Sequence, residues 1–214
     1  MTISEAADVH ETSIHELANA SRAAFAMLKL TRAGEVPASA ADLAREAEVA
    51  ESDVIGLAQR WLRVDERNGL ANLDQSPAGP SRYRVEIADR EISSGGGCSV
   101  DTFLLTLATG LPVHVEATCP ATGTHVTVDL SPETVEALDP PGAVVALIDL
   151  GAIRLSGREQ VDALICSQQP FFALADAASD WLAAHPGGRI FGVREYLEQA
   201  RGDVRRLQGR GEST

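Results

Sequence analysis

The sequence contains few cysteines, few aromatic residues and fewer basic than acidic residues. Of its 214 residues, three are cysteine, Cys98, Cys119 and Cys166. Three are too few for the disulfide framework of a secreted protein, and no two have the Cys-x-x-Cys spacing of a zinc site. Aromatic residues make up 4% of the chain, so the core must consist mainly of Ala, Val, Leu and Ile.

The charge balance and the lack of long apolar runs exclude further classes of protein. Lys and Arg number 18 against 31 Asp and Glu, and the resulting net charge of −13 repels phosphate backbones. No apolar run reaches the roughly 18 residues of a membrane span, and the acidic N-terminus lacks the pattern of a secretory signal. We therefore expect a cytoplasmic protein with neither nucleic acid nor membrane as a partner.

The chain does contain enough apolar residues for a globular core, at 44%. In the first part of the chain, apolar residues at helical spacing predict three helices, at 13–30, 40–49 and 51–65. Ser39 is the expected cap of the second helix, and alternation predicts a strand at 82–87. Three helices followed by a strand pair is the plan of a winged helix-turn-helix domain. Because this part is acidic and its third helix begins with ESD, we predict a scaffold or lid at 1–90 that does not bind DNA.

The remainder of the chain groups its predicted strands together and flanks them with helices. The strands are expected at 113–119, 124–130, 142–150 and 161–167. The helices are expected at 98–110, closed by Gly110, and at 131–138, 170–187 and 193–207. Ser131 and Pro132 are the start signal of the second of these helices. The predicted fold is α+β, with a winged-helix-like three-helix domain at 1–90 and a mixed-sheet domain with flanking helices at 91–214.

The segment GGGCSVDT, residues 95–102, places a thiol and a carboxyl three positions apart at a predicted helix start. This spacing puts Cys98 and Asp101 on one face, about 5–6 Å apart, and a helix N-terminus favours the thiolate. Such a pair is suited to act together on one small target. The alternative, which spacing alone favours, is a capping carboxylate beside a small core residue.

The other two cysteines allow two interpretations each. Cys166 ends a predicted strand, where it either faces a pocket or completes the core. Cys119 lies at a strand end before a turn, where it either joins the other thiols on a metal or is structural. The histidines lack HxxxH and HExxH spacing, and no GxGxxG, P-loop or GxSxG motif occurs. Nucleotide and serine-hydrolase chemistry therefore have no support.

Three segments, CSVDT, VHVEATCPATG and ICSQQPFF, occur in the same order as similar segments of a known family. The sequence resembles the organomercurial lyases (alkylmercury lyases) of bacterial mercury resistance. That family has Cys-x-x-Asp-Thr, then a strand ending in Cys-x-Ala-Thr-Gly, then a Cys before Phe-Phe. The resemblance covers roughly residues 20–205 and implies a winged-helix-like N-terminal part with no role in DNA binding.

The resemblance implies a lyase that cleaves the carbon–mercury bond by protonolysis, giving a hydrocarbon and Hg(II). Cys98 and Cys166 would bind the mercury of substrate and product, Asp101 would join them and carry the proton, and Cys119 would be structural. Thiolates suit this role because mercury is a soft metal. The resemblance implies no cofactor, external thiols for turnover, and a mercuric reductase or thiol carrier that accepts the Hg(II).

The sequence departs from the family at two places beside these cysteines. Gly95, Gly96 and Gly97 stand where members commonly have aromatic residues, and SQQP follows Cys166 where members have Cys and His. Two alternative functions remain open. One is a thiol-based metal-binding or metal-sensing regulator with a winged-helix domain. The other is a paralogue that uses the same pocket on another organometal or a copper ion.

Overall fold

The computed structural model describes residues 19, 22–23, 25–27, 29–30, 39–54, 64–65, 70–71, 83–87, 90–92, 98–149 and 165–207. Gly95, Gly96 and Gly97 lie outside the described residues, as does most of the predicted strand 161–167. Within the described part, no helix is both long enough and apolar enough to cross a membrane.

The described N-terminal residues include a capped helix and one short strand pair. α2 (Ala40–Ala47) begins after Ser39, whose hydroxyl accepts a hydrogen bond from a first-turn backbone N–H at 3.1 Å, as the cap signal predicts. β1 (Val64–Asp65) pairs with β2 (Leu70–Ala71). The predicted helix 51–65 is therefore wrong at its end, where the chain pairs as a strand. The winged-helix arrangement itself is not confirmed, because much of it lies outside the described residues.

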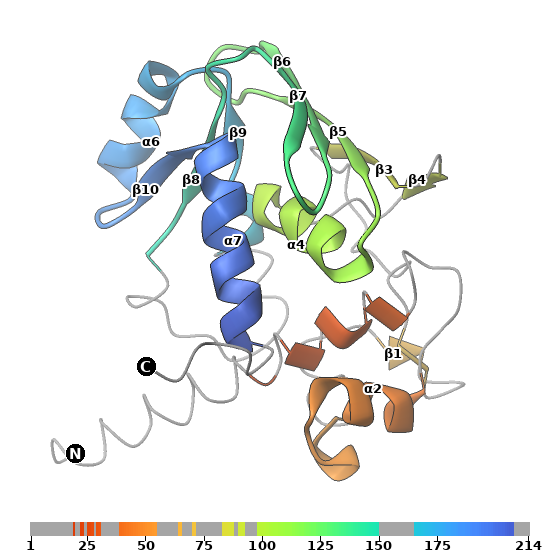
Figure 1. The fold of residues 1–214 in the computed structure, drawn as a ribbon. Coiled ribbons are helices and arrows are strands. Elements are labelled where there is room, and N and C mark those ends of the chain that lie inside the picture. The colour runs from red at the N-terminus through yellow and green to blue at the C-terminus, as the bar shows by residue number, and fades with distance from the viewer. Residues whose placement is uncertain are drawn as a thin grey trace, which may run out of the picture.

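A small apolar core joins α2 to the described helical residues on either side of it. Its buried members are Ala23, Ala26, Met27, Leu43, Ala44, Ala47 and Val54. Phe25, from the first of these helical segments, packs against Ala108 and Val204 of the C-terminal half. The helical segment of Phe25 therefore contacts the C-terminal half directly. Figure 1 shows the N-terminal helical residues and α2 below the sheets.

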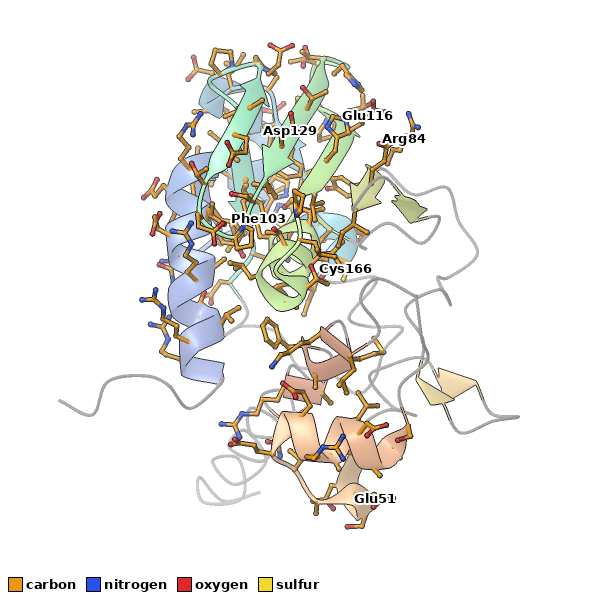
Figure 2. The ribbon with its side chains drawn as sticks, turned by 45° about the vertical axis from the view of Figure 1, so that its right-hand side comes forward. Glu51, Arg84, Phe103, Glu116, Asp129 and Cys166 are labelled. Carbon is orange, nitrogen blue, oxygen red and sulfur yellow. The ribbon has the colours of Figure 1, made fainter. Side chains whose placement is uncertain are left out.

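The larger sheet has five antiparallel strands in the order β4-β3-β5-β6-β7. Their bounds are Tyr83–Ile87 (β3), Arg90–Ile92 (β4), Val113–Thr118 (β5), His125–Leu130 (β6) and Val135–Asp139 (β7). β3, β5 and β6 alternate buried with more exposed residues, because one face covers the core and the other meets solvent. Figure 2 shows Arg84, Glu116 and Asp129 on the outer face and Phe103 beneath the sheet.

β3 precedes residue 90, where the sequence-based boundary ends the N-terminal domain. The strand pairs with β5, and Tyr83, Val85 and Ile87 are buried in the same core as the C-terminal strands. β3 thus belongs to the sheet of the C-terminal half. The division of the chain into two domains stays a prediction.

The smaller sheet has the order β10-β8-β9, with β8 at Val144–Leu147, β9 at Phe171–Phe172 and β10 at Arg189–Gly192. All pairings among the described strands of the C-terminal half are antiparallel. The predicted mixed sheet is therefore wrong for these strands, although the α+β class is confirmed. Hairpin connections such as the turn between β5 and β6 are too short for the crossover that parallel strands need.

Two helices cover the inner side of the sheets. α4 (Ser99–Thr109) ends at Gly110, whose φ of 72° is left-handed, and α7 (Val193–Leu207) has the bounds that its amphipathic pattern predicts. The ring of Phe103 in α4 meets that of Tyr196 in α7 edge to face, with centroids 4.8 Å apart. The two helices lie side by side in Figure 1, and their contact sets the position of the N-terminal end of α4.

The helix predicted at 131–138 is wrong, because β7 occupies its second half and a turn its first half. The Ser131 hydroxyl does accept a hydrogen bond from Thr134 N–H at 3.1 Å, the local bond that a helix cap makes. However, the carbonyl of Thr134 also accepts from Ser131 N–H at 2.8 Å. The pair of bonds closes a tight turn between β6 and β7, so the same residues reverse the chain between two strands.

The helix predicted at 170–187 is shorter than expected. Phe171 and Phe172 are buried and pair with β8 as the strand β9. A short 3-10 turn, η3 (Ala175–Ala178), then leads into α6 (Ser179–Ala184). Successive side chains of a strand point to opposite faces, and both of these rings are buried in the core.

Candidate active site

Cys98 lies at the N-terminal end of α4, where its backbone and its thiol face the same carboxylate. The Oδ2 atom of Asp101 accepts a hydrogen bond from the backbone N–H of Cys98 at 3.1 Å. The same oxygen lies 3.5 Å from the Cys98 Sγ and can accept the thiol proton. The predicted proximity of thiol and carboxyl is therefore present, together with the capping bond that the alternative interpretation required.

Cys166 reaches this carboxylate from a distant part of the sequence. It begins a 3-10 turn, η2 (Cys166–Gln168), so the prediction that it ends a strand is wrong at this residue. Its Sγ lies 3.9 Å from Asp101 Oδ2, and Figure 2 shows it beside α4. The two sulfurs and one carboxylate oxygen lie within 4.8 Å of one another. Among the described residues, no other group of three His, Cys, Asp or Glu side chains converges in this way.

The site is shielded from water. Cys98 is 2% exposed and Cys166 is 9% exposed. The hydrogen bond with Cys166, burial, and the negative charge of Asp101 together raise the pKa of the Cys98 thiol well above its ordinary value. The prediction that the helix N-terminus favours the thiolate is therefore wrong for Cys98, which holds its proton at neutral pH. The carboxylate that can accept the proton is already in contact with the thiol.

Gln169 is a member of the site that the sequence did not indicate as one. It is 4% exposed, and its Nε2 lies 3.6 Å from Cys98 Sγ while its Oε1 accepts a hydrogen bond from Ile148 N–H at 3.3 Å. In the sequence it was visible only as part of SQQP, a departure from the family. No spacing rule links a glutamine to a cysteine 71 residues away.

Cys119 lies apart from this cluster, in the turn between β5 and β6. It is 1% exposed, and its backbone bonds to Thr124 and Gly123 close the turn. Burial raises the pKa of its thiol, but hydrogen bonds from the Thr122 side chain and from nearby backbone N–H groups outweigh burial and lower that pKa. Its structural role stays a prediction.

Two described histidines have partners outside the cluster. The Nδ1 of His114 lies 2.5 Å from Asp129 Oδ1 on the outer face of the sheet. The ring of His185 stacks on Trp181 and contacts the Gln168 side chain, beside η2. His185 thus helps to hold the turn that carries Cys166, and neither ring joins the thiols.

The chain is similar to known proteins of one kind. A family model described as alkylmercury lyase matches residues 77–202. An alkylmercury lyase of Bacillus cereus is 30% identical over 143 residues, which are 65% of this chain and 61% of that protein. One of Streptomyces lividans is 28% identical over 162 residues, 75% of this chain and 67% of that protein. The chain thus spans about 61% of the length of the Bacillus cereus relative.

The fold also matches a solved structure, the mercury-bound form of MerB2. The TM-score is 0.59 at 17% identity, over 94% of this chain and 98% of that one. This similarity establishes the fold. The relatives named above are alkylmercury lyases, and none of these findings supports the alternative of a metal-sensing regulator.

Proposed function

The chain belongs to the alkylmercury lyase family, and from this premise we propose that it cleaves the carbon–mercury bond of organomercurials by protonolysis. The observation that carries the proposal is the convergence of Cys98, Cys166 and Asp101 within 4.8 Å. Two thiols offer the soft ligands that mercury prefers, and a carboxylate between them can accept and return a proton. These three side chains are the groups that the proposed bond cleavage uses.

We propose that capture proceeds by exchange of thiols on the metal. An organomercurial arrives as the adduct of a small thiol. One protein thiol binds the mercury and gives its proton to the small thiolate that it displaces. The second thiol then passes its proton to Asp101, which lies 3.5 Å from Cys98 Sγ and 3.9 Å from Cys166 Sγ. The mercury now carries two thiolates and one carbon, and the carboxylate has become a carboxylic acid.

Bond cleavage follows from that protonation state. Two thiolates push electron density toward the carbon, which makes the carbon basic. The carboxylic acid of Asp101 gives its proton to the carbon, and both electrons of the carbon–mercury bond form the new carbon–hydrogen bond. The hydrocarbon leaves, Asp101 is again a carboxylate, and Hg(II) remains bound to the two sulfurs as a neutral bis-thiolate. Burial strengthens these steps because water competes neither for the proton nor for the metal.

The proposal includes how the product leaves. External thiols would remove Hg(II) by exchange, and a mercuric reductase or thiol carrier would accept it. No separate cofactor is required, because the metal of the substrate supplies the electrophile. The cytoplasm is the proposed compartment, since both sulfurs must stay reduced to act.

Phenylmercury tests this function because its two products are measured independently. With excess thiol, the wild-type protein is expected to release benzene and Hg(II) in equal amounts. Cys98→Ala and Cys166→Ala are expected to release neither above the uncatalysed rate. Full conversion by either variant would remove its thiol from the mechanism, and no benzene from the folded wild type would contradict the proposed function itself.

A further inference from the structure

The buried side chain of Gln169 lies between the end of β8 and the sulfur of Cys98. We propose that Gln169 is a positioning residue, whose amide holds the Cys98 sulfur toward Asp101 and stabilises that sulfur as it gives up its proton. The mechanistic part of this inference rests on the proposed function, but the contact between amide and sulfur does not.

The orientation of the Gln169 amide is fixed by its other partner. The backbone N–H of Ile148 is a donor, 3.3 Å from Oε1, so the oxygen of the amide must face it. The NH₂ group must then face Cys98, whose Sγ lies 3.6 Å from Nε2. The sulfur thus has a donor on one side and the Asp101 carboxylate, an acceptor, on the other. This arrangement directs the thiol proton to Asp101.

The main chain of Gln169 makes this placement rigid. Its carbonyl oxygen accepts hydrogen bonds from Ser99 N–H at 3.1 Å, from the Ser99 hydroxyl at 2.8 Å and from the Tyr83 hydroxyl at 3.3 Å. Those bonds tie the residue after η2 to the first turn of α4 and to β3. Gln169 therefore fixes the position of Cys98 relative to Cys166, and its side chain also contacts the Cys98 sulfur.

A purely structural role would require only part of these contacts. In that case the amide would merely satisfy the Ile148 N–H, and any acceptor of the same shape would do. Two substitutions together separate the roles. Gln169→Glu keeps an oxygen for Ile148 but loses the donor for the sulfur, and Gln169→Met loses that donor without adding a charge. Gln199→Glu is the control, since it makes the glutamate substitution on the exposed face of α7, where the side chain contacts Asp203.

The test measures the rate at which iodoacetamide alkylates each cysteine, resolved by peptide mass spectrometry, and the single-turnover release of benzene from phenylmercury. We expect Gln169→Glu and Gln169→Met each to slow alkylation of Cys98 and benzene release by about tenfold or more, as for loss of a hydrogen bond to a charged group. We expect Gln199→Glu to leave both rates near those of the wild type. Wild-type rates of Cys98 alkylation in either Gln169 variant, or an equal loss in Gln199→Glu, would overturn the inference.

A measurement that leaves Gln169 unchanged covers the case in which the Gln169 variants do not fold. The side-chain NH₂ resonances of Gln169 are expected to shift when Cys98 is replaced by Ala and to stay in place when Cys119 is replaced. Gln169 NH₂ resonances that do not shift in Cys98→Ala would overturn the inference. Failure of the proposed function would give a different result: the wild type would yield no benzene, while the rate of Cys98 alkylation would still depend on Gln169.

Discussion

Asp101 Oδ2 accepts the backbone N–H of Cys98 at 3.1 Å and lies 3.5 Å from the Sγ of the same residue. One oxygen atom therefore both caps α4 and faces the thiol. Helix capping and proton transfer are usually treated as alternative roles for an acidic residue at this position. Here the capping bond positions the Asp101 carboxylate for proton transfer. The cap fixes the oxygen where a thiol proton can reach it.

The three cysteines are expected to separate into two classes when each is replaced by serine. Cys98→Ser and Cys166→Ser should abolish phenylmercury turnover, because a hydroxyl is a hard and protonated donor that mercury does not prefer. Cys119→Ser should retain turnover and lose about 1 kcal/mol of stability, since Cys119 is 1% exposed but apart from the cluster. Turnover and chemical denaturation of the three variants check this division.

An inactive but folded Cys119→Ser would contradict the structural role of that residue. An active Cys98→Ser would contradict the two-thiol site. Because each variant changes a single sulfur to oxygen at a buried position, the comparison holds the size of the substitution constant.

Gly110 should be needed for the stability of α4 and not for its chemistry. Its φ is +72°, and a Cβ built there would meet nothing within 4 Å, so Gly110→Ala should cost about 1 kcal/mol from backbone strain alone. Gly142→Ala is the matched control, because that glycine is equally open but has no left-handed φ. Thermal unfolding of both variants measures the difference; equal stability of the two would show that the left-handed end of α4 is not strained by a side chain.

Much of the C-terminal half follows from local sequence patterns. The amphipathic period at 193–207 predicts α7, and the glycine at 110 predicts the end of α4, because both depend on interactions within one turn of helix. The strands at 113–118 and 125–130 follow from alternation around a short turn. In the site, the sequence placed Cys98 beside Asp101 because their spacing is that of one helical turn.

Other features depend on contacts that no local pattern encodes. The Ser131 hydroxyl accepts the bond that a helix cap makes, yet the residues that follow form the strand β7 because they pair with β6. Cys166 and Gln169 lie at the N-terminal end of α4 because β9 pairs with β8, and this pairing positions the residues just before β9. The family resemblance named Cys166 as the second mercury-binding thiol, and the structure places its sulfur 3.9 Å from Asp101 Oδ2. The resemblance could not name Gln169, which stands in a segment where this chain departs from the family.

The contact between His114 and Asp129 should make stability depend on pH. The hydrogen bond to Asp129, helped by the nearby Glu116, raises the pKa of His114 above its ordinary value of 6.5, although partial burial opposes the shift. The charged pair therefore contributes fully below about pH 6.5 and is lost as the pH rises through the folded pKa. The contribution is modest, because His114 is 35% exposed on the sheet surface.

Denaturation of the wild type and of His114→Gln across this pH range checks the sign. The wild type should be the more stable protein at pH 6, and the difference should shrink as the pH rises. Asp129→Asn should remove most of the same pH dependence. A difference that grows with pH would contradict the assignment of the charged pair.

The role of Asp101 is tested most directly by a single turnover of phenylmercury with Asp101→Asn. The asparagine oxygen can still accept the Cys98 N–H, so α4 and both thiols should remain in place. We expect the variant to bind one phenylmercury per chain, like the wild type, and to release benzene about 10²- to 10⁴-fold more slowly, because no acid remains to protonate the carbon. Release of benzene at the wild-type rate would contradict proton transfer by Asp101, and with it the central step of the mechanism.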